Sequence, residues 1–231
     1  GSYMVKITNL PAGTKKVHLV ANAIDMTDAE AQDLQSLTAA KERDPQLDAP
    51  ICWGEISIDK LLEANPSVTM LRQCAKISLE IDNSFQSNFT NAGLYVYNTA
   101  TKAAIAPANY IEPTTDDLAE STDLRTDNPL GGGTATTVAV NETSAGKAMV
   151  IIKANYKDSE GHDSEGYYKV ALYKDAKEKI QYALLRNHHY TIKVTKVNDY
   201  GFSTLEEAKK SLPENRVEVE VVDDNPEITQ M

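Results

Sequence analysis

Apolar and polar residues alternate in short stretches along this chain, most clearly near its end. The apolar members of two such stretches are Tyr190, Ile192 and Val194, and Val217, Val219 and Val221. A period of two is typical of a half-buried β-strand. The apolar positions change parity between Val194 and Val197, which predicts a β-bulge near residues 195–196. The chain therefore ends in two predicted strands.

The same alternation predicts further strands upstream. They lie at residues 4–8, 17–23, 53–58, 76–81, 93–98, 138–140, 149–154 and 167–173. Their number and spacing are typical of antiparallel β-sandwiches. Residues 107–133 are poor in large apolar residues and rich in Thr, Asp, Pro and Gly, so we expect a long surface loop there.

Two capping-box patterns predict short helices between the strands. Thr27 and Glu30 open a helix that we expect to run to about residue 43, with Leu34 and Leu37 facing inward. Thr204 and Glu207 open the second. Its apolar stripe is expected to comprise Leu205, Ala208 and Leu212, with Pro213 ending the helix. A helical turn is also expected near residues 58–63.

We expect a domain boundary near Gln73, dividing residues 1–73 from residues 74–231. The first section has one helix and few strands for a sheet domain, so its open strand edges would need partners. Gly1 and Ser2 resemble a cloning scar, so the absence of an export signal says nothing about the compartment.

Composition narrows the class of protein. The 231 residues carry 34 acidic and 23 basic side chains, a net charge of −11, and no cluster of basic residues. Binding to a phosphate backbone would lack its electrostatic attraction, so nucleic acid is not expected as a partner. No apolar run approaches the roughly 20 residues of a membrane-spanning helix.

No motif arranges residues for catalysis, and we expect no enzyme, cofactor or metal. His188 and His189 are neighbours on a strand and face opposite sides, so they cannot chelate one ion together. We expect Arg186 and Asn187 beside them to hold backbone groups. The acidic loop at residues 158–166 offers oxygen ligands for calcium, although its spacing is not that of an EF-hand and a solvated hairpin tip needs no ion.

Three other features of the sequence each allow two interpretations. The glycines at residues 131–133 are followed by no Lys-Ser/Thr pair, so a turn is expected and not a phosphate loop. Cys52 and Cys74 are either one disulfide or two buried thiols. Trp53 either fills the core of a small domain, which we favour, or stacks on a sugar at the surface.

Three motifs in a fixed order carry a family resemblance. They are residues 71–77 (LRQCAKI), 167–172 (YYKVAL) and 185–190 (LRNHHY), followed by Gly201 and the final valine-rich strand. In this order they resemble the fimbrillin family, the major and accessory fimbrial subunits of Bacteroidetes. A weaker likeness extends to residues 17–22 and 50–54.

The resemblance implies a mainly β fold of two β-sandwich domains, of transthyretin-like, Greek-key type, with short helical excursions. The N-terminal domain would lack its first strands. Fimbrillins are exported as lipoprotein precursors and lose an N-terminal strand by proteolysis. A strand of a neighbouring subunit fills the vacated groove, which builds a fimbria on the outer membrane.

For this chain the resemblance therefore implies a structural subunit of a fimbria or pilus at the cell surface. Its partners would be other fimbrial subunits, in a homo- or heteropolymer. Residues 3–73 would carry the acceptor groove. The polymerisation strand is expected to comprise Val217, Val219, Val221 and Val222.

Alternatives remain for the role of residues 217–222 and for the function of the whole chain. Residues 217–222 can equally close their own domain. The chain as a whole can be a surface adhesin, or a carbohydrate- or protein-binding β-sandwich module that binds host glycans or proteins without polymerising. The ending Asp223-Asp224-Asn225-Pro226 is acidic and broken by proline, which makes a poor apolar donor. A repeating stalk subunit therefore loses ground to an accessory or tip component, and the sequence does not separate the two.

Overall fold

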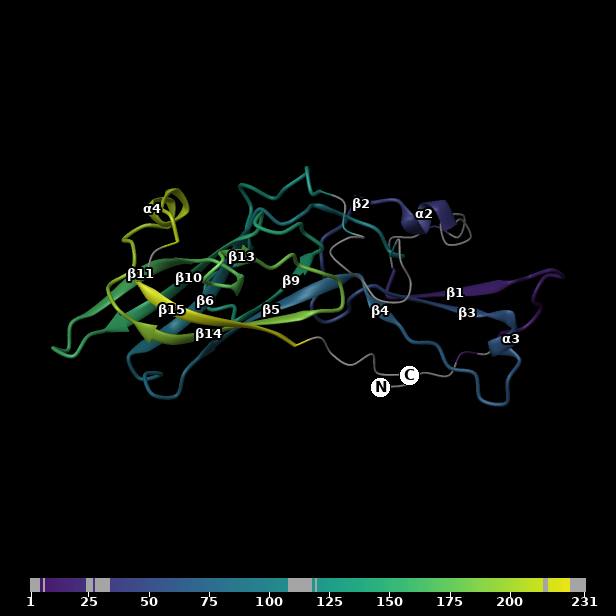
Figure 1. The fold of residues 1–231 in the computed structure, drawn as a ribbon, viewed down its shortest axis with the longest axis horizontal. Helices are drawn as coiled ribbons and strands as arrows, with labels where there is room; N and C mark the ends of the chain where they lie inside the picture. Colours follow the sequence, from purple (N-terminus) through teal and green to yellow (C-terminus); the bar gives the residue numbers. More distant parts are fainter. Residues whose placement is uncertain are drawn as a thin grey trace.

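The computed structural model describes residues 5, 7–23, 27, 34–107, 118, 120–213 and 216–224. The protein is mainly β, with several sheets and a few short helices. Figure 1 shows an elongated molecule with β1 and β3 at one end and α4 and β11 at the other. No helix in the described residues is long and apolar enough to cross a membrane.

Two four-stranded sheets form the larger part of the molecule. The β14 sheet has the order β15-β14-β5-β9 and consists of β15 (Val217–Asp224), β14 (His189–Val197), β5 (Cys74–Ile81) and β9 (Thr137–Asn141). The β10 sheet has the order β11-β10-β6-β8 and consists of β11 (Asp163–Val170), β10 (Met149–Lys157), β6 (Phe89–Tyr97) and β8 (Leu130–Gly131).

The main hydrophobic core lies between these two sheets. Ile77 and Ile192 from the β14 sheet, and Leu94 and Ile152 from the β10 sheet, have no exposed side-chain surface. Ile77 and Ile192 alternate with polar residues on the opposite face of their sheet, which is the physical basis of the period-two prediction. In the β10 sheet both faces are covered, since Ile151, the neighbour of Ile152, is buried in a separate cluster with Tyr97 and Ala208.

Strand pairing departs from the prediction at one place. Most pairs are antiparallel, as expected, but β14 and β5 run parallel, with His189 opposite Lys76 and Val194 opposite Ile81. Parallel neighbours require a long crossover, and here the chain builds the whole β10 sheet between these two strands. The predicted bulge is confirmed by a register shift between Val194 and Lys196.

The smaller part contains the three-stranded β3 sheet. Its order is β1-β3-β4, and its strands are β1 (Lys16–Ala21), β3 (Cys52–Ser57) and β4 (Leu71–Arg72). A second hydrophobic cluster covers one face of this sheet. It consists of Leu37, Trp53, Ile105 and Ala106. Because these residues come from both sides of Gln73, the two sections share packing, and the boundary there stays a prediction.

The first helix ends earlier in the chain than predicted. In the described residues α2 spans Leu34–Thr38, and residues 28–30 of the capping box lie outside them. Leu37 is buried as expected. The prediction of a helix to residue 43 is wrong, because Lys41–Glu42 forms β2, which pairs with β7 (Lys102–Ala103). Pairing with a distant segment satisfies backbone groups that a helix would otherwise pair locally.

The other two predicted helical segments are present. Helix α3 spans Ile58–Leu61, and α4 spans Leu205–Lys210 with the capping box of Thr204 and Glu207 complete. Ala208 is buried, but the placement of Leu212 on the apolar stripe is wrong, since its side chain is 79% exposed. The helix ends at Lys210 and is followed by Ser211 in an extended conformation. Pro213 further disfavours the helical conformation at Leu212, the residue directly before it.

Two strand predictions also need correction. At positions 5, 7 and 8 the chain is not in a strand, and residues 4 and 6 lie outside the described residues. The strand predicted at residues 167–173 is divided: β11 ends at Val170, and Tyr173–Asp175 forms β12, which pairs with β13 (Ile180–Gln181) in a separate hairpin.

Candidate functional site

Strand β15 is one of the two edge strands of the β14 sheet. It pairs antiparallel with β14 from Val217 opposite Val197 to Asp224 opposite His189, and no other described strand pairs with it. One side of its backbone is therefore the place where another extended chain would add to this sheet.

The predicted polymerisation valines lie on both faces of β15. Val217 is 6% exposed, and Val219 and Val221 are half-buried against the main core. Val222 faces outward with 40% of its surface exposed, on the same side as Glu218 and Glu220. The strand thus closes its own sandwich while its outer edge is open, and its use in polymerisation stays a prediction.

Side chains hold β15 at both ends. Nδ1 of His188 lies 3.0 Å from each carboxylate oxygen of Asp223, and the His188 ring stacks on Tyr190. Near the other end, Glu218 accepts hydrogen bonds from Asn198 at 3.0 Å and Lys196 at 3.3 Å. These contacts lower the pKa of the Glu218 carboxyl. An intramolecular position of β15 is therefore well fixed.

The two adjacent histidines have separate partners, in keeping with their opposite orientations. His188 contacts Asp223, whereas Nε2 of His189 lies 2.9 Å from the hydroxyl of Ser78 on the outer face of the β14 sheet. Burial, then the nearby Lys76 cation, lowers the pKa of His189. Asn187 accepts a hydrogen bond from the backbone of Arg72, as predicted for a residue that holds backbone.

The β3 sheet has an apolar groove on the face opposite Trp53. A cavity of about 600 Å³ lies against β1 and β3. Its apolar lining comprises Val5, Ile7, Leu19, Ile56, Val68 and Met70, among others. Segment 68–70 crosses directly over Gly54, where an added Cβ would lie 2.5 Å from the carbonyl oxygen of Thr69. Strand β1 pairs only with β3 among the described strands, so this sheet also ends in an open edge.

A buried arginine joins the two parts of the molecule. Arg186 is 2% exposed and forms an ion pair with Glu142, with Nε at 2.9 Å and Nη2 at 2.6 Å from Oε2. It also donates to the carbonyls of Ile105 at 2.8 Å and Ala104 at 3.1 Å. The amide of Ile105 in turn donates to the carbonyl of Leu37. The larger part thus holds the segment that covers the β3 sheet, and the prediction that Arg186 holds backbone is confirmed.

Other candidate residues have structural roles. Trp53 is 2% exposed and stacks with His18 at 5.7 Å between ring centroids, so the core reading is confirmed and sugar stacking on Trp53 is excluded. Cys52 and Cys74 are free thiols. Burial raises the pKa of Cys74 to about 11, which keeps it protonated and unreactive.

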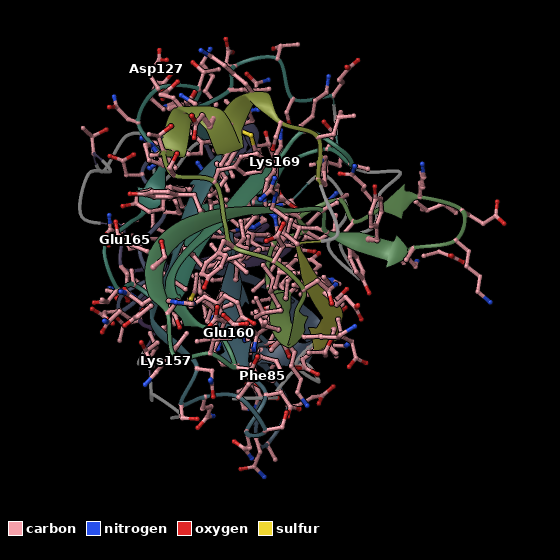
Figure 2. The ribbon with its side chains drawn as sticks, turned by 90° about the vertical axis from the view of Figure 1, so that its left-hand side faces the viewer. Phe85, Asp127, Lys157, Glu160, Glu165 and Lys169 are labelled. Carbon is pink, nitrogen blue, oxygen red and sulfur yellow. The ribbon has the colours of Figure 1, made fainter. Side chains whose placement is uncertain are left out.

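Residues 158–162 of the predicted acidic loop form the β10–β11 hairpin tip, where Figure 2 labels Glu160 at the end of the molecule facing the viewer, and residues 163–166 belong to β11. Ligand atoms of Asp158, Glu160 and His162 lie within 4.8 Å of one another. Asp158 already accepts from Tyr200 at 2.6 Å and from the amides of Glu160 and His162 at 2.9 Å, which holds its pKa low. The tip is therefore ordered by its own hydrogen bonds.

No protein-family model matches this sequence, and no curated protein matches it. Among solved structures, the tip fimbrial protein Mfa3 of Porphyromonas gingivalis, solved with a C-terminal truncation, matches 90% of this chain and 79% of its own. The TM-score is 0.53 at 14% sequence identity. This chain shares its fold with Mfa3. The expected likeness to fimbrial subunits is thereby confirmed at the level of the fold.

Two further structures are similar to a lesser degree than Mfa3. A candidate cell adhesion protein of Parabacteroides distasonis matches 82% of this chain and 69% of its own, with a TM-score of 0.44 and 13% identity. One of Bacteroides ovatus matches 84% and 59%, with a TM-score of 0.30 and 11% identity.

Sequence reasoning missed one residue that organises the Mfa3-like fold of this chain. Glu142, the partner of Arg186, was not among the candidate residues of the sequence. A glutamate two positions after the predicted strand at residues 138–140 was the available signal, but its partner lies 44 positions away.

Proposed function

We propose that this chain is a structural subunit of a cell-surface fimbria, assembled by addition of a strand from one subunit to a sheet of the next. The observation that carries the proposal is the apolar groove beside the open edge of β1, in a chain with the fold of a tip fimbrial protein. Groove side chains would recognise alternate residues of the incoming strand, and main-chain hydrogen bonds would hold it.

The acceptor in this proposal is the β3 sheet, within residues 3–73. The donor is β15 with the tail that follows it, which carries Val217, Val219, Val221 and Val222. The partners are other fimbrial subunits, and the location is the outer membrane after export as a lipoprotein precursor. Because Asp223 and Asp224 make the end of β15 acidic and Asp223 is bound to His188, we favour an accessory or tip component over a stalk subunit.

A peptide covering residues 214–231 tests this function. Mixed with the full chain, it should bind and protect the amides of β1 from hydrogen exchange. Leu19→Glu places a charge in the groove and should weaken peptide binding at least tenfold. Leu212→Glu makes the same change at a position that is 79% exposed and outside the groove, and should leave binding unchanged.

Two results would contradict the proposal. One is the absence of any bound peptide or oligomer at millimolar concentration. The other is equal loss of binding in both variants, which would show that charge alone, and not the groove, decides the interaction.

A further inference from the structure

A second cavity lies where the two parts of the molecule meet. Its volume is about 490 Å³, within the range of small-molecule sites. The floor is the outer face of β5, β9 and β14, and one wall is the loop of residues 46–50. Cys74 marks this contact, since its sulfur lies 3.8 Å from the carbonyl oxygen of Gln46.

The charged residues that line this cavity are all basic. Arg72 and Lys76 line it together with His188 and His189, and no Asp or Glu does. Lys76 lies directly opposite His189 in the parallel pairing of β5 and β14. In a protein of net charge −11, two permanent cations beside one cavity, Arg72 and Lys76, are a local reversal of sign.

The two permanent cations in this cavity have no acidic partner in the part of the chain that the structure describes. Neither Arg72 nor Lys76 forms an ion pair with any described residue, whereas Lys193, further along the same face, is paired with Asp82 at 3.2 Å. Asp224 and Glu80 act on His189 electrostatically, more weakly than Lys76, and lie outside the cavity lining. A cleft lined by charge of one sign attracts the opposite charge, and an arginine fork binds a planar oxyanion with two hydrogen bonds.

The rest of the lining indicates what carries the oxyanion. The cavity also presents the Gln46 amide and the Thr137 hydroxyl, which pair well with hydroxyl groups, and small apolar surfaces at Ala139 and Pro50. Two of the three floor strands, β5 and β14, are inner strands that offer no free backbone edge to an extended peptide, while the third, β9, is an edge strand. The volume exceeds what a single inorganic ion would fill.

We propose that this basic cavity binds an acidic saccharide, with the carboxylate or sulfate of the sugar held by Arg72 and Lys76. The site is separate from the groove of the β3 sheet and from the edge of β15. A failure of strand-mediated assembly would therefore not count against saccharide binding at this site, and a failure of saccharide binding would not count against assembly.

Binding of three defined sugars to the full chain tests the proposal: 3′-sialyllactose, a sulfated disaccharide and lactose. Calorimetry or ligand-observed NMR should detect at least one of the acidic sugars and not lactose. The double variant Arg72→Gln/Lys76→Gln should lower the affinity at least tenfold, as expected for losing a hydrogen bond to a charged group. Lys193→Gln is the matched control, because it removes a lysine from the same sheet face outside this cavity and should bind normally.

Mapping on the unmodified chain keeps the test independent of how the variants fold. Amide and ring signals of His189 and the amides of residues 46–47 should shift on titration with the acidic sugar. Binding of lactose with equal affinity, equal loss in Lys193→Gln, or shifts confined to other residues would overturn the proposal. So would the absence of binding by either acidic sugar. Equal competition by sodium sulfate would show a site for a free oxyanion and overturn the saccharide assignment, as would binding of an acidic peptide in place of the sugars.

Discussion

The two parts of this molecule bury their sheets to very different degrees. The β14 and β10 sheets face each other, and residues such as Ile152 and Ile192 have no exposed surface. The β3 sheet has one face covered by α2 and residues 105–106, while its other face lines an apolar groove. A sheet with one half-covered face keeps less of the stabilisation that comes from removing apolar surface from water.

The comparison shows that one part of the molecule provides most of the stability and that the other part offers surfaces for binding. The larger part carries the closed core, and the smaller part depends on contacts reaching it from outside, chiefly the segment held by Arg186. Open strand edges and half-filled grooves are the surfaces that another chain can complete. We therefore expect the smaller part to be the less stable and the more responsive to a bound strand.

The largest effect is expected at the junction. Arg186→Ala removes the guanidinium that pairs with Glu142 and donates to the carbonyls of Ala104 and Ile105, and should cost about 3–5 kcal/mol. Hydrogen exchange should rise in β1 and β3 more than in β10. The double variant Arg186→Met/Glu142→Leu removes both charges and should recover part of the loss. Uniform destabilisation of both parts would contradict the idea that the larger part holds the smaller one.

Matched truncations in the two parts should differ in cost. Ile152→Ala, in the closed core, should lower the free energy of unfolding by about 2–5 kcal/mol. Leu19→Ala, at the half-open groove, should cost about 1 kcal/mol or less, since little additional surface is lost from contact. Urea denaturation of each variant measures both values, and equal costs would show that the groove is as tightly packed as the core.

Substitutions at the helix N-caps test the same contrast between the two parts, with a smaller expected change in stability. Thr204→Ala breaks a complete capping box at α4 and should cost about 1 kcal/mol. Ser57→Ala removes a single long contact to the amide of Lys60 at α3, 3.4 Å in length, and should cost a few tenths of a kcal/mol. Thermal unfolding compares the two, and a larger loss at Ser57 would reverse the expected order.

The expected pH dependence of the free energy of unfolding arises in the larger part of the molecule. Hydrogen bonds from the backbone and hydroxyl of Ser84, together with Lys193, lower the pKa of Asp82 to about 2. A depressed folded-state pKa contributes stability that is present above about pH 4 and is lost as the pH falls toward 2. Asp82→Asn should therefore reduce the fall in the urea midpoint between pH 5 and pH 2.5. Asp163→Asn, an exposed carboxylate of the hairpin, is the control, and an unchanged slope in Asp82→Asn would contradict the assignment.

Local patterns predicted local structure well. The alternation in residues 190–194 and 217–221, the bulge after Val194 and the cap at Thr204 depend on side-chain period and on backbone groups a few residues apart. The burial of Trp53 and Leu37 follows from their size and apolar character. These features lie within the range over which one stretch of chain determines its own conformation.

The sequence by itself therefore determined that this is a mainly β protein with short capped helices. Only the tertiary structure decided that β14 runs parallel to β5, that residues 41–42 leave the helix to pair with β7, and that Arg186 meets Glu142. It also brought Arg72, Lys76 and His189 around one cavity. The reason is physical: hydrogen bonds and charges between residues tens of positions apart depend on how the sheets assemble, and no local pattern encodes that assembly.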